Sequence, residues 1–216
     1  VSTGEMGTSM FWTDENPIFE ATLRKFETTL AKDKFVGHID INCIVNSNGI
    51  YPLEFTSRFG YPQIQIQRAG INEPFGNFLY KVASGEKFVI NTKTGFQVGA
   101  YMVVPPFPYD DKKTFETFSK DAVVIFRKEM KEGLHPMHLK MINKEWLITG
   151  DSGLALLVTG TGLTMRDAQK MMFNRIKKRL EWKLLAYFLV FMAVFSAVMV
   201  GGTYYNAEKR RSSEML

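Results

Sequence analysis

Four side chains that carry oxygen donors alternate along two neighbouring segments of the chain: Asp40, Asn42, Glu54 and Thr56. Both segments are largely apolar, and Ser-Asn-Gly at 47–49 separates them, which predicts a β-hairpin over residues 35–58. Side chains alternate between the two faces of a strand, so a suitable register brings all four to one face. Adjacent carboxylates repel each other unless a cation lies between them, and Mg²⁺ prefers such oxygen ligands.

The register depends on the loop. A three-residue loop with Gly49 in the left-handed conformation places Ile50 opposite Asn46. Glu54 then faces Asn42, and Thr56 faces Asp40. A two-residue turn would instead send Asp40 and Glu54 to opposite faces and remove the site. In the first register the other face is expected to form an apolar core wall of Ile41, Cys43, Val45, Tyr51, Leu53 and Phe55. Without a metal, the polar face is simply the solvated side of a half-buried hairpin.

Residues 53–62, Leu-Glu-Phe-Thr-Ser-Arg-Phe-Gly-Tyr-Pro, resemble the metal-site strand of ATP-grasp ligases. More narrowly, they are similar to the phosphoribosylamine–glycine ligase (glycinamide ribonucleotide synthetase) family, whose version reads roughly E-F-N-x-R-F-G-D-P-E. Gly-Glu-Met-Gly at 4–7 is similar to that family's G-G-M-G, and residues 150–164 resemble a strand–turn–helix of its C-terminal domain. The resemblance implies an α+β fold, with the C-terminal half of an ATP-grasp domain at 1–94 and a small antiparallel β-rich domain at 95–180.

The resemblance also implies roles for individual residues. Glu54 matches the family's metal ligand, Asp40 lies where many ATP-grasp enzymes keep a partner acid, and Thr56 replaces the usual metal-ligating Asn. Arg58 matches the arginine near the nucleotide phosphates, whose planar fork of donors suits phosphate oxygens. We expect Arg58, the one catalytic candidate, and Asn42 to contact the nucleotide. The implied cofactors are Mg²⁺ or Mn²⁺, with ATP as co-substrate.

The implied reaction is ATP-dependent amide formation, in which a carboxylate is activated as an acyl phosphate and an amine then displaces phosphate. Three departures from the family pattern leave the substrates open: Tyr61 and Gln63 replace acidic residues, and Glu5 replaces a glycine. Two other interpretations are a degenerate ATP-grasp domain that binds a nucleotide or partner without catalysis, and a scaffold on a membrane anchor.

Composition is that of a folded chain: 45% of the 216 residues are hydrophobic and 13% are aromatic. The net charge of +5 lies largely near the C-terminus and does not indicate nucleic-acid binding. A single cysteine, Cys43, excludes a disulfide within the chain. Because the chain begins at Val1, the resemblance implies that an N-terminal half, with the groups that grip adenine and the outer phosphates, is missing, and that the chain alone does not turn over.

The last forty residues differ from the rest of the chain because they contain a long uncharged, apolar run. Residues 184–200 carry no charge, and the apolar run extends to about residue 205, which is about the 20 residues needed to cross a bilayer. Trp182 and the tyrosines at 204–205 suit the two interfaces. The predicted single transmembrane helix has slightly more basic residues before it than after it, so the ATP-grasp part is expected on the cytoplasmic side.

Periodicity and capping residues predict helices over 16–32, with Thr13 or Asp14 as cap, over 71–84, stopped by Gly85, and over 164–180. For the last of these, Thr164 and Asp167 resemble a capping box. Short strands are expected between residues 95 and 163. Glycines at 160 and 162 are interpreted as a strand-to-helix turn, not a phosphate cradle, and His135 and His138 as turn residues. His38 shares the face of Asp40.

Overall fold

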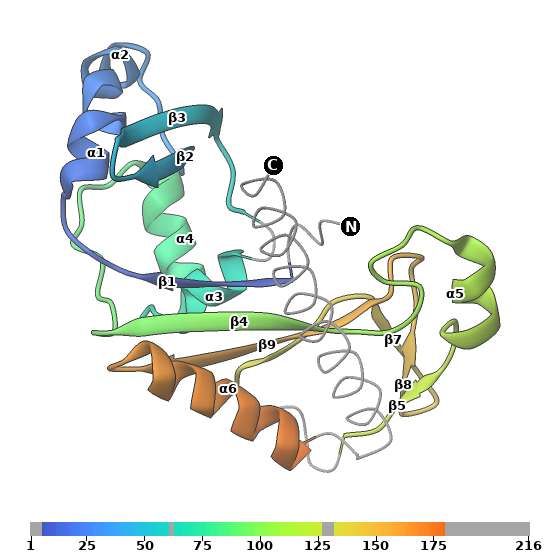
Figure 1. The fold of residues 1–216 in the computed structure, drawn as a ribbon. Helices are drawn as coiled ribbons and strands as arrows, with labels where there is room; N and C mark the ends of the chain where they lie inside the picture. The colour runs from blue at the N-terminus through green and yellow to red at the C-terminus, as the bar shows by residue number, and fades with distance from the viewer. Residues whose placement is uncertain (1–5, 61–62, 127–131, 180–216) are drawn as a thin grey trace, which may run out of the picture. The chain divides into compact units, whose positions relative to one another are not determined.

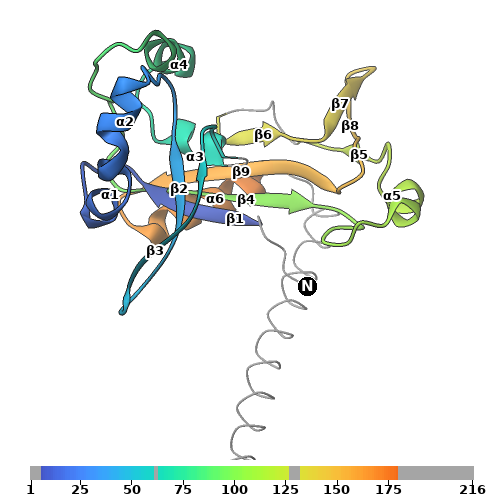
Figure 2. The same ribbon diagram turned by 90° about the horizontal axis from the view of Figure 1, so that it is seen from above.

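A computed structural model describes residues 6–60, 63–126 and 132–179 (Figures 1 and 2). Of the described residues, those between 6 and 100 and 157–173 form one compact unit, and those between 101 and 156 and 174–179 form the other. The predicted membrane segment 184–205 lies outside the described residues. Within the described ranges, no helix is both long enough and apolar enough to span a bilayer.

A four-stranded sheet runs in the order β1-β4-β9-β6, with β1 at Gly7–Phe11, β4 at Phe96–Val103, β9 at Leu154–Gly162 and β6 at Leu134–Pro136. β1 pairs antiparallel with β4, from Gly7 opposite Ala100 to Phe11 opposite Phe96. Strand β9 is buried along most of its length, as expected of a strand covered on both faces. β4 and β9 confirm strands predicted from the sequence, whereas β1 was not predicted.

In the first unit, helices lie on both faces of this sheet (Figure 1). Helix α3 (Gln63–Ala69) packs Ile66, which is fully buried, against Gly99 of β4. On the other face, α6 (Met165–Arg179) packs Ala168 and Met172 against β9. Gly160 lies within β9, where a Cβ would meet the α6 backbone, so this glycine allows close packing of strand and helix and is not a turn residue.

The start of α6 confirms the predicted capping interaction. The Thr164 hydroxyl donates to Asp167 Oδ2 at 2.7 Å, and the Asp167 backbone N–H donates back to Thr164 Oγ1 at 3.2 Å. A side-chain cap satisfies one of the backbone donors that a helix leaves free at its N-terminus. The helix therefore begins where the sequence indicates.

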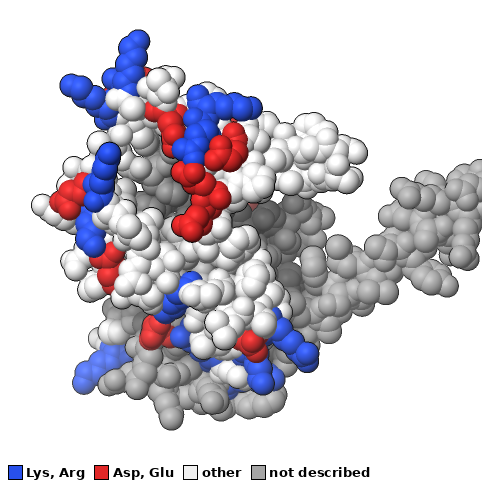
Figure 3. Space-filling model, turned by 90° about the vertical axis from the view of Figure 1, so that its left-hand side faces the viewer, with Lys and Arg blue, Asp and Glu red and all other residues white. Residues whose placement is uncertain are grey.

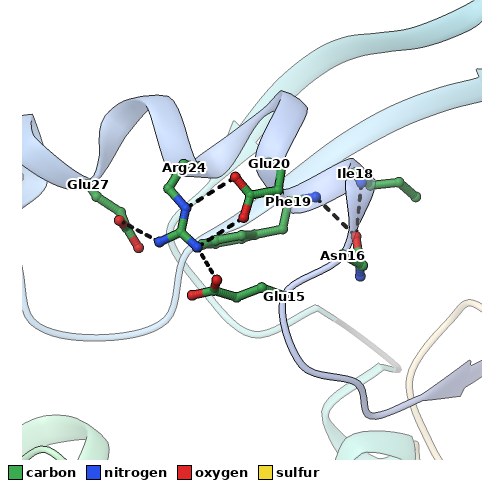
Figure 4. Close-up of polar contacts among 7 residues, drawn as sticks. All are labelled: Glu15, Asn16, Ile18, Phe19, Glu20, Arg24 and Glu27. Atoms are coloured by element: carbon green, nitrogen blue, oxygen red, sulfur yellow. Dashed lines mark hydrogen bonds and ion pairs between the residues drawn. The ribbon is translucent and has the colours of Figure 1, made fainter.

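The predicted helix over residues 16–32 is wrong as a continuous element. It is divided into α1 (Pro17–Ala21), a 3₁₀ turn (Leu23–Phe26) and α2 (Glu27–Lys32). Thr22 leaves helical geometry, with φ −125° and ψ −89°, while its hydroxyl bonds the Ile18 carbonyl at 2.6 Å. Such side-chain bonding to the backbone competes with the helix. The cap is Asn16, whose Oδ1 accepts the backbone N–H groups of Ile18 and Phe19 at 2.9 and 3.0 Å (Figure 4), and not Thr13 or Asp14.

Helix α4 (Phe75–Ser84) begins later than predicted, directly after Pro74, and ends as predicted at Gly85. Proline fixes φ and has no N–H, so it suits the position before a first helical turn. Gly85 has φ 68°, the left-handed conformation that terminates helices. Helix α3 was not predicted.

The second unit contains a three-stranded antiparallel sheet of order β5-β8-β7, at Val123–Val124, Glu145–Ile148 and Leu139–Ile142. β7 and β8 form a hairpin whose turn residues Asn143 and Lys144 both have positive φ. The predicted β-rich character is confirmed, but helix α5 (Lys112–Phe118) was missed. Asp111 caps α5 by accepting the backbone N–H groups of Lys113 and Thr114. The hydrogen bond from the Thr114 hydroxyl, together with these backbone bonds, holds the pKa of Asp111 below its usual value.

Candidate functional site

The predicted hairpin consists of β2 (Asp40–Asn46) and β3 (Gly49–Thr56), which pair antiparallel in the first unit. Asp40 lies opposite Thr56 and Asn42 lies opposite Glu54, as the sequence predicts. The four oxygen-bearing side chains therefore come together from two strands.

The loop that produces this register is not the predicted one. Asn46 lies opposite Gly49, so the turn has two residues, and Asn46 Oδ1 accepts the Asn48 backbone N–H at 2.8 Å. The shift that such a turn would cause is cancelled by a bulge. Asn42 pairs with Glu54 but its neighbour Cys43 pairs with Pro52, which leaves Leu53 as an extra residue on β3. Proline has no N–H for the ladder, so an irregular pairing beside it is expected.

Hydrogen bonds link the polar side chains across the strands. The Asn42 amide donates from Nδ2 to Glu54 Oε1 at 3.0 Å, and the Thr56 hydroxyl lies 3.5 Å from Asp40 Oδ2. Asn42 and Glu54 are exposed, whereas Asp40 and Thr56 are half-buried. The Asn42 bond occupies one oxygen of Glu54 and leaves the other for a ligand.

The opposite side of the hairpin is not the core wall that the sequence predicted. Val45, Tyr51, Leu53 and Phe55 are 46–63% exposed. The bulge also moves Tyr51 opposite Ile44, out of the predicted apolar row. On this side of the hairpin, the Phe55 ring packs edge-to-face against the Phe26 ring, with ring centroids 4.9 Å apart. Much of the hairpin's apolar surface thus remains open to solvent.

Arg58 follows β3 and is exposed. Its guanidinium Nη1 donates to the Phe59 carbonyl at 3.3 Å. The next residue, Phe59, stacks on His38 with ring centroids 4.4 Å apart. Burial lowers the pKa of His38, and the nearby Asp40 opposes part of that effect. The stack connects the segment before β2 to the segment that carries Arg58.

These residues fit a hard divalent ion by their donor chemistry. Two carboxylates, an amide and a hydroxyl lie on one face, and Mg²⁺ is often held by one or two carboxylates together with water and substrate phosphates. Among the described residues, no cluster of three or more His, Cys, Asp or Glu side chains could hold a metal by itself. A metal here would need the remaining ligands from water and nucleotide.

A groove beside Asp40 is a feature that sequence reasoning missed. It measures about 750 Å³ and is lined by residues 13–16, by apolar side chains of α1 and the 3₁₀ turn, and by Asp40 and Ile41. The polar stretch Thr-Asp-Glu-Asn at 13–16, which follows the edge strand β1, is the sequence signal for this groove.

Arg24 pairs with Glu15, a residue of the groove lining, and with two further glutamates nearby (Figure 4). It forms ion pairs with Glu15, with Glu20 at 3.0 Å and with Glu27 at 2.9 Å, and its guanidinium lies 4.7 Å above the Phe19 ring. The hydrogen bonds that Arg24 donates to Glu20 and Glu27 raise its pKa. Glu15, which lines the groove, therefore shares the Arg24 cation with two other carboxylates. Figure 3 shows acidic and basic side chains interspersed on this side of the molecule.

The arrangement of sheet, flanking helices and polar hairpin resembles part of an ATP-grasp domain. The chain is similar to the crystal structure of phosphoribosylamine–glycine ligase from Thermotoga maritima, with TM-score 0.60 and 19% identity over 81% of this chain and 43% of that one. It is also similar to the biotin carboxylase domain of Hydrogenobacter thermophilus 2-oxoglutarate carboxylase, a complex with MgADP, ADP and bicarbonate (TM-score 0.52, 13% identity, 81% of this chain and 38% of that one).

A third similar structure is the urea carboxylase of Kluyveromyces lactis, with TM-score 0.53 and 12% identity over 81% of this chain and 15% of that one. No protein-family model and no curated protein matches the sequence. At these identities the likeness establishes the fold alone, a mixed α/β fold with antiparallel sheets. The chain spans less than half the length of each of these structures.

Proposed function

We propose that this chain is part of an ATP-dependent carboxylate–amine ligase of the ATP-grasp type, with its metal site on the β2–β3 hairpin. The observation that carries the proposal is the juxtaposition of Asp40, Asn42, Glu54 and Thr56 on one face, in a fold that resembles part of an ATP-grasp domain. Residues 1–94 would supply the ATP-grasp part and residues 95–180 the C-terminal part.

Glu54 and Asp40, helped by Thr56, would hold Mg²⁺ or Mn²⁺. The ion would neutralise the phosphate charge of ATP as the γ-phosphoryl group leaves. Asn42 holds the Glu54 carboxylate through its 3.0 Å hydrogen bond and, in this proposal, would also contact the nucleotide. Arg58 is exposed and extends the same segment, so its guanidinium can donate to phosphate oxygens.

The reaction needs no protein nucleophile, because positioning and electrostatic stabilisation carry phosphoryl transfer. A carboxylate oxygen attacks the γ-phosphorus, the bond to ADP breaks and an acyl phosphate forms. The amine then attacks the acyl carbon, inorganic phosphate leaves and the amide remains. The specific version that the sequence favours is a phosphoribosylamine–glycine ligase-like activity of the purine biosynthesis type. The groove beside Asp40 offers room for a co-substrate next to the metal site.

The test is trapping of the acyl phosphate with hydroxylamine. The longest product of the gene would be incubated with ATP, Mg²⁺ and single carboxylic acids, glycine first, and ADP and hydroxamate would be measured. We expect both products with at least one acid, and the loss of both in Glu54→Gln. Binding of MgATP without either product would favour the second candidate.

That second candidate is a degenerate ATP-grasp domain that binds a nucleotide or a partner without catalysis. Thr56 favours it, because a hydroxyl lying 3.5 Å from Asp40 is a weaker and shorter metal ligand than the amide of the family pattern. Gln63 favours it as well, since it replaces an acidic residue of that pattern and begins helix α3.

We further propose that residues 184–205 attach the chain to a membrane as a single span, with the ATP-using part on the cytoplasmic side. The uncharged run and its aromatic ends support this proposal. Alkaline carbonate extraction of cell membranes tests it. We expect the chain to stay in the membrane pellet, and Met192→Arg with Ala193→Arg to release it, because each arginine at the centre of a span costs about 2.5–3.5 kcal/mol.

A further inference from the structure

Helix α6 presents a basic stripe on the side that faces away from β9. Ala168 and Met172 are buried against the strand, at 0% and 6% exposure. Arg166, Lys170 and Lys177 are exposed, and Phe173 is 40% exposed among them. The spacing of four, three and four residues places this stripe along one face of a helix with 3.6 residues per turn. In Figure 1, α6 runs along the sheet with β9 on one side.

The surrounding segment carries the charge of the whole chain. Residues 163–183 hold seven Lys or Arg and two Asp or Glu, a net charge of +5 that equals the net charge of all 216 residues. Asp167 is one of the two acidic residues, and its carboxylate is bonded to the Thr164 hydroxyl at the start of the helix. The remainder of the sequence is balanced, so attraction to an anionic surface would concentrate at α6.

The position of α6 in the chain indicates that the anionic partner of the stripe is a membrane surface. The described helix ends at Arg179, and the uncharged run begins at residue 184, five residues later. Five extended residues span at most about 18 Å. If the run enters a bilayer, the C-terminal end of α6 lies within that distance of the headgroups. Basic side chains close to a bilayer are attracted to its anionic headgroups, and an exposed aromatic ring among them can enter the headgroup boundary.

We propose that the stripe of Arg166, Lys170, Phe173 and Lys177 binds the anionic lipid headgroups of the membrane to which the chain is attached. The inference rests on the membrane attachment proposed above. Phe173 enters the headgroup boundary, and the three basic side chains contact lipid phosphates or carboxylates. Each Lys or Arg near such a surface contributes about 1 kcal/mol, and the attraction is screened by salt. The stripe thereby fixes how the ATP-grasp part approaches the bilayer.

The experiment uses the full chain and vesicles of phosphatidylcholine alone or with about 30% phosphatidylserine, an anionic content that gives a negative surface potential. A fluorophore sensitive to polarity is attached at Asn174→Cys, next to the stripe, in a Cys43→Ser background. We expect blue-shifted emission, protected from an aqueous quencher, on the anionic vesicles at about 0.1 M salt and its loss at about 0.5 M salt. A label at Glu116→Cys on α5, also exposed, serves as the control and should not respond.

A second measurement needs no cysteine. Flotation of the chain with anionic vesicles is compared for the wild type, for Arg166→Gln with Lys170→Gln and Lys177→Gln, and for a matched control in which Lys112, Lys113 and Lys120 become Gln. Loss of three charges near the surface should weaken partitioning on the order of 100-fold for the stripe variant only. The effect is measured for each variant as the ratio of its partitioning onto anionic vesicles to its partitioning onto neutral vesicles.

The outcomes separate the two proposals. Flotation with both vesicle types, with no response of the label and no effect of the stripe variant, would retain the membrane attachment and overturn the role of the stripe. Absence of flotation with either vesicle type would overturn both. Binding of a short DNA duplex that required the same three basic residues, without binding to vesicles, would assign the stripe to nucleic acid and also overturn the proposal.

Discussion

At the scale of single residues, the candidate site depends on how Glu54 is held. Its carboxylate is exposed, so without a partner the side chain would sample several rotamers. The Asn42 amide restricts it through a 3.0 Å hydrogen bond. Partners of this kind orient metal ligands and commonly change metal affinity by about 10- to 100-fold when removed.

Asn42→Ala should therefore weaken Mg²⁺-dependent ATP binding about tenfold. Binding would be measured by titration at fixed Mg²⁺. Asn46→Ala, in the same strand but at the turn, is the matched control and should leave affinity within about twofold, the ordinary scatter for a distant site. Equal affinity for wild type and Asn42→Ala would show that Glu54 does not depend on Asn42.

His38 provides a second prediction at this scale. Burial lowers its pKa in the folded chain below the usual 6.5, and Asp40 only partly opposes that shift. Between 6.5 and the lowered value, the unfolded chain binds more protons than the folded chain, so stability falls as the pH falls through this range. Above about 6.5 the contribution of His38 is fully present.

Urea unfolding between about pH 7.5 and pH 5 would measure the effect. The wild type should lose stability over this range, and His38→Gln should flatten the profile, because glutamine does not titrate. A wild-type profile no steeper than that of His38→Gln would contradict the assignment.

At the scale of elements, the hairpin illustrates what the sequence can and cannot predict. Its two strands and the pairs Asp40–Thr56 and Asn42–Glu54 were predicted. The two-residue turn and the bulge were not predicted. Each shifts the register by one residue in opposite directions, so the predicted pairs result whether both are present or neither is. The strongly periodic α6 and its capping residues were likewise predicted. Three features were not predicted: the break at Thr22, the short helix α3 and the exposed apolar side of the hairpin. They depend on local hydrogen bonding and on packing between distant segments, which the pattern of a short stretch of sequence does not reveal.

The contact between β9 and α6 yields a prediction about an element. A Cβ at Gly160 would meet the backbone of α6 around Ala168 and Met172. Backbone atoms cannot rotate away, so Gly160→Ala should destabilise the chain by about 1–3 kcal/mol. A Cβ at Gly76 in α4 would meet open space, with nothing within 4 Å, and Gly76→Ala should be neutral or stabilise by up to about 1 kcal/mol. Denaturant unfolding of both variants tests the pair, and equal effects would contradict the packing described.

At the scale of the whole molecule, the fold is supported by structural likeness and the function by a few side chains of the hairpin. The likeness to ATP-grasp structures covers 81% of the chain, which is a statement about architecture. The metal, the nucleotide and the ligase reaction are proposals built on four side chains and Arg58. The proposed membrane span rests on the uncharged run at 184–200, on its aromatic ends and on the basic residues that precede it.

The measurement that tests the central claim most directly is calorimetric titration of ATP into the longest product of the gene, with and without Mg²⁺, for the wild type and Glu54→Gln. Glutamine keeps the shape of the side chain and removes its charge, so a loss of binding can be assigned to the carboxylate. We predict binding that requires Mg²⁺ in the wild type and is at least about tenfold weaker in Glu54→Gln, as expected when a charged metal ligand is lost. Binding of ATP that is independent of both Mg²⁺ and Glu54, or no binding, would contradict a metal–nucleotide site on this hairpin.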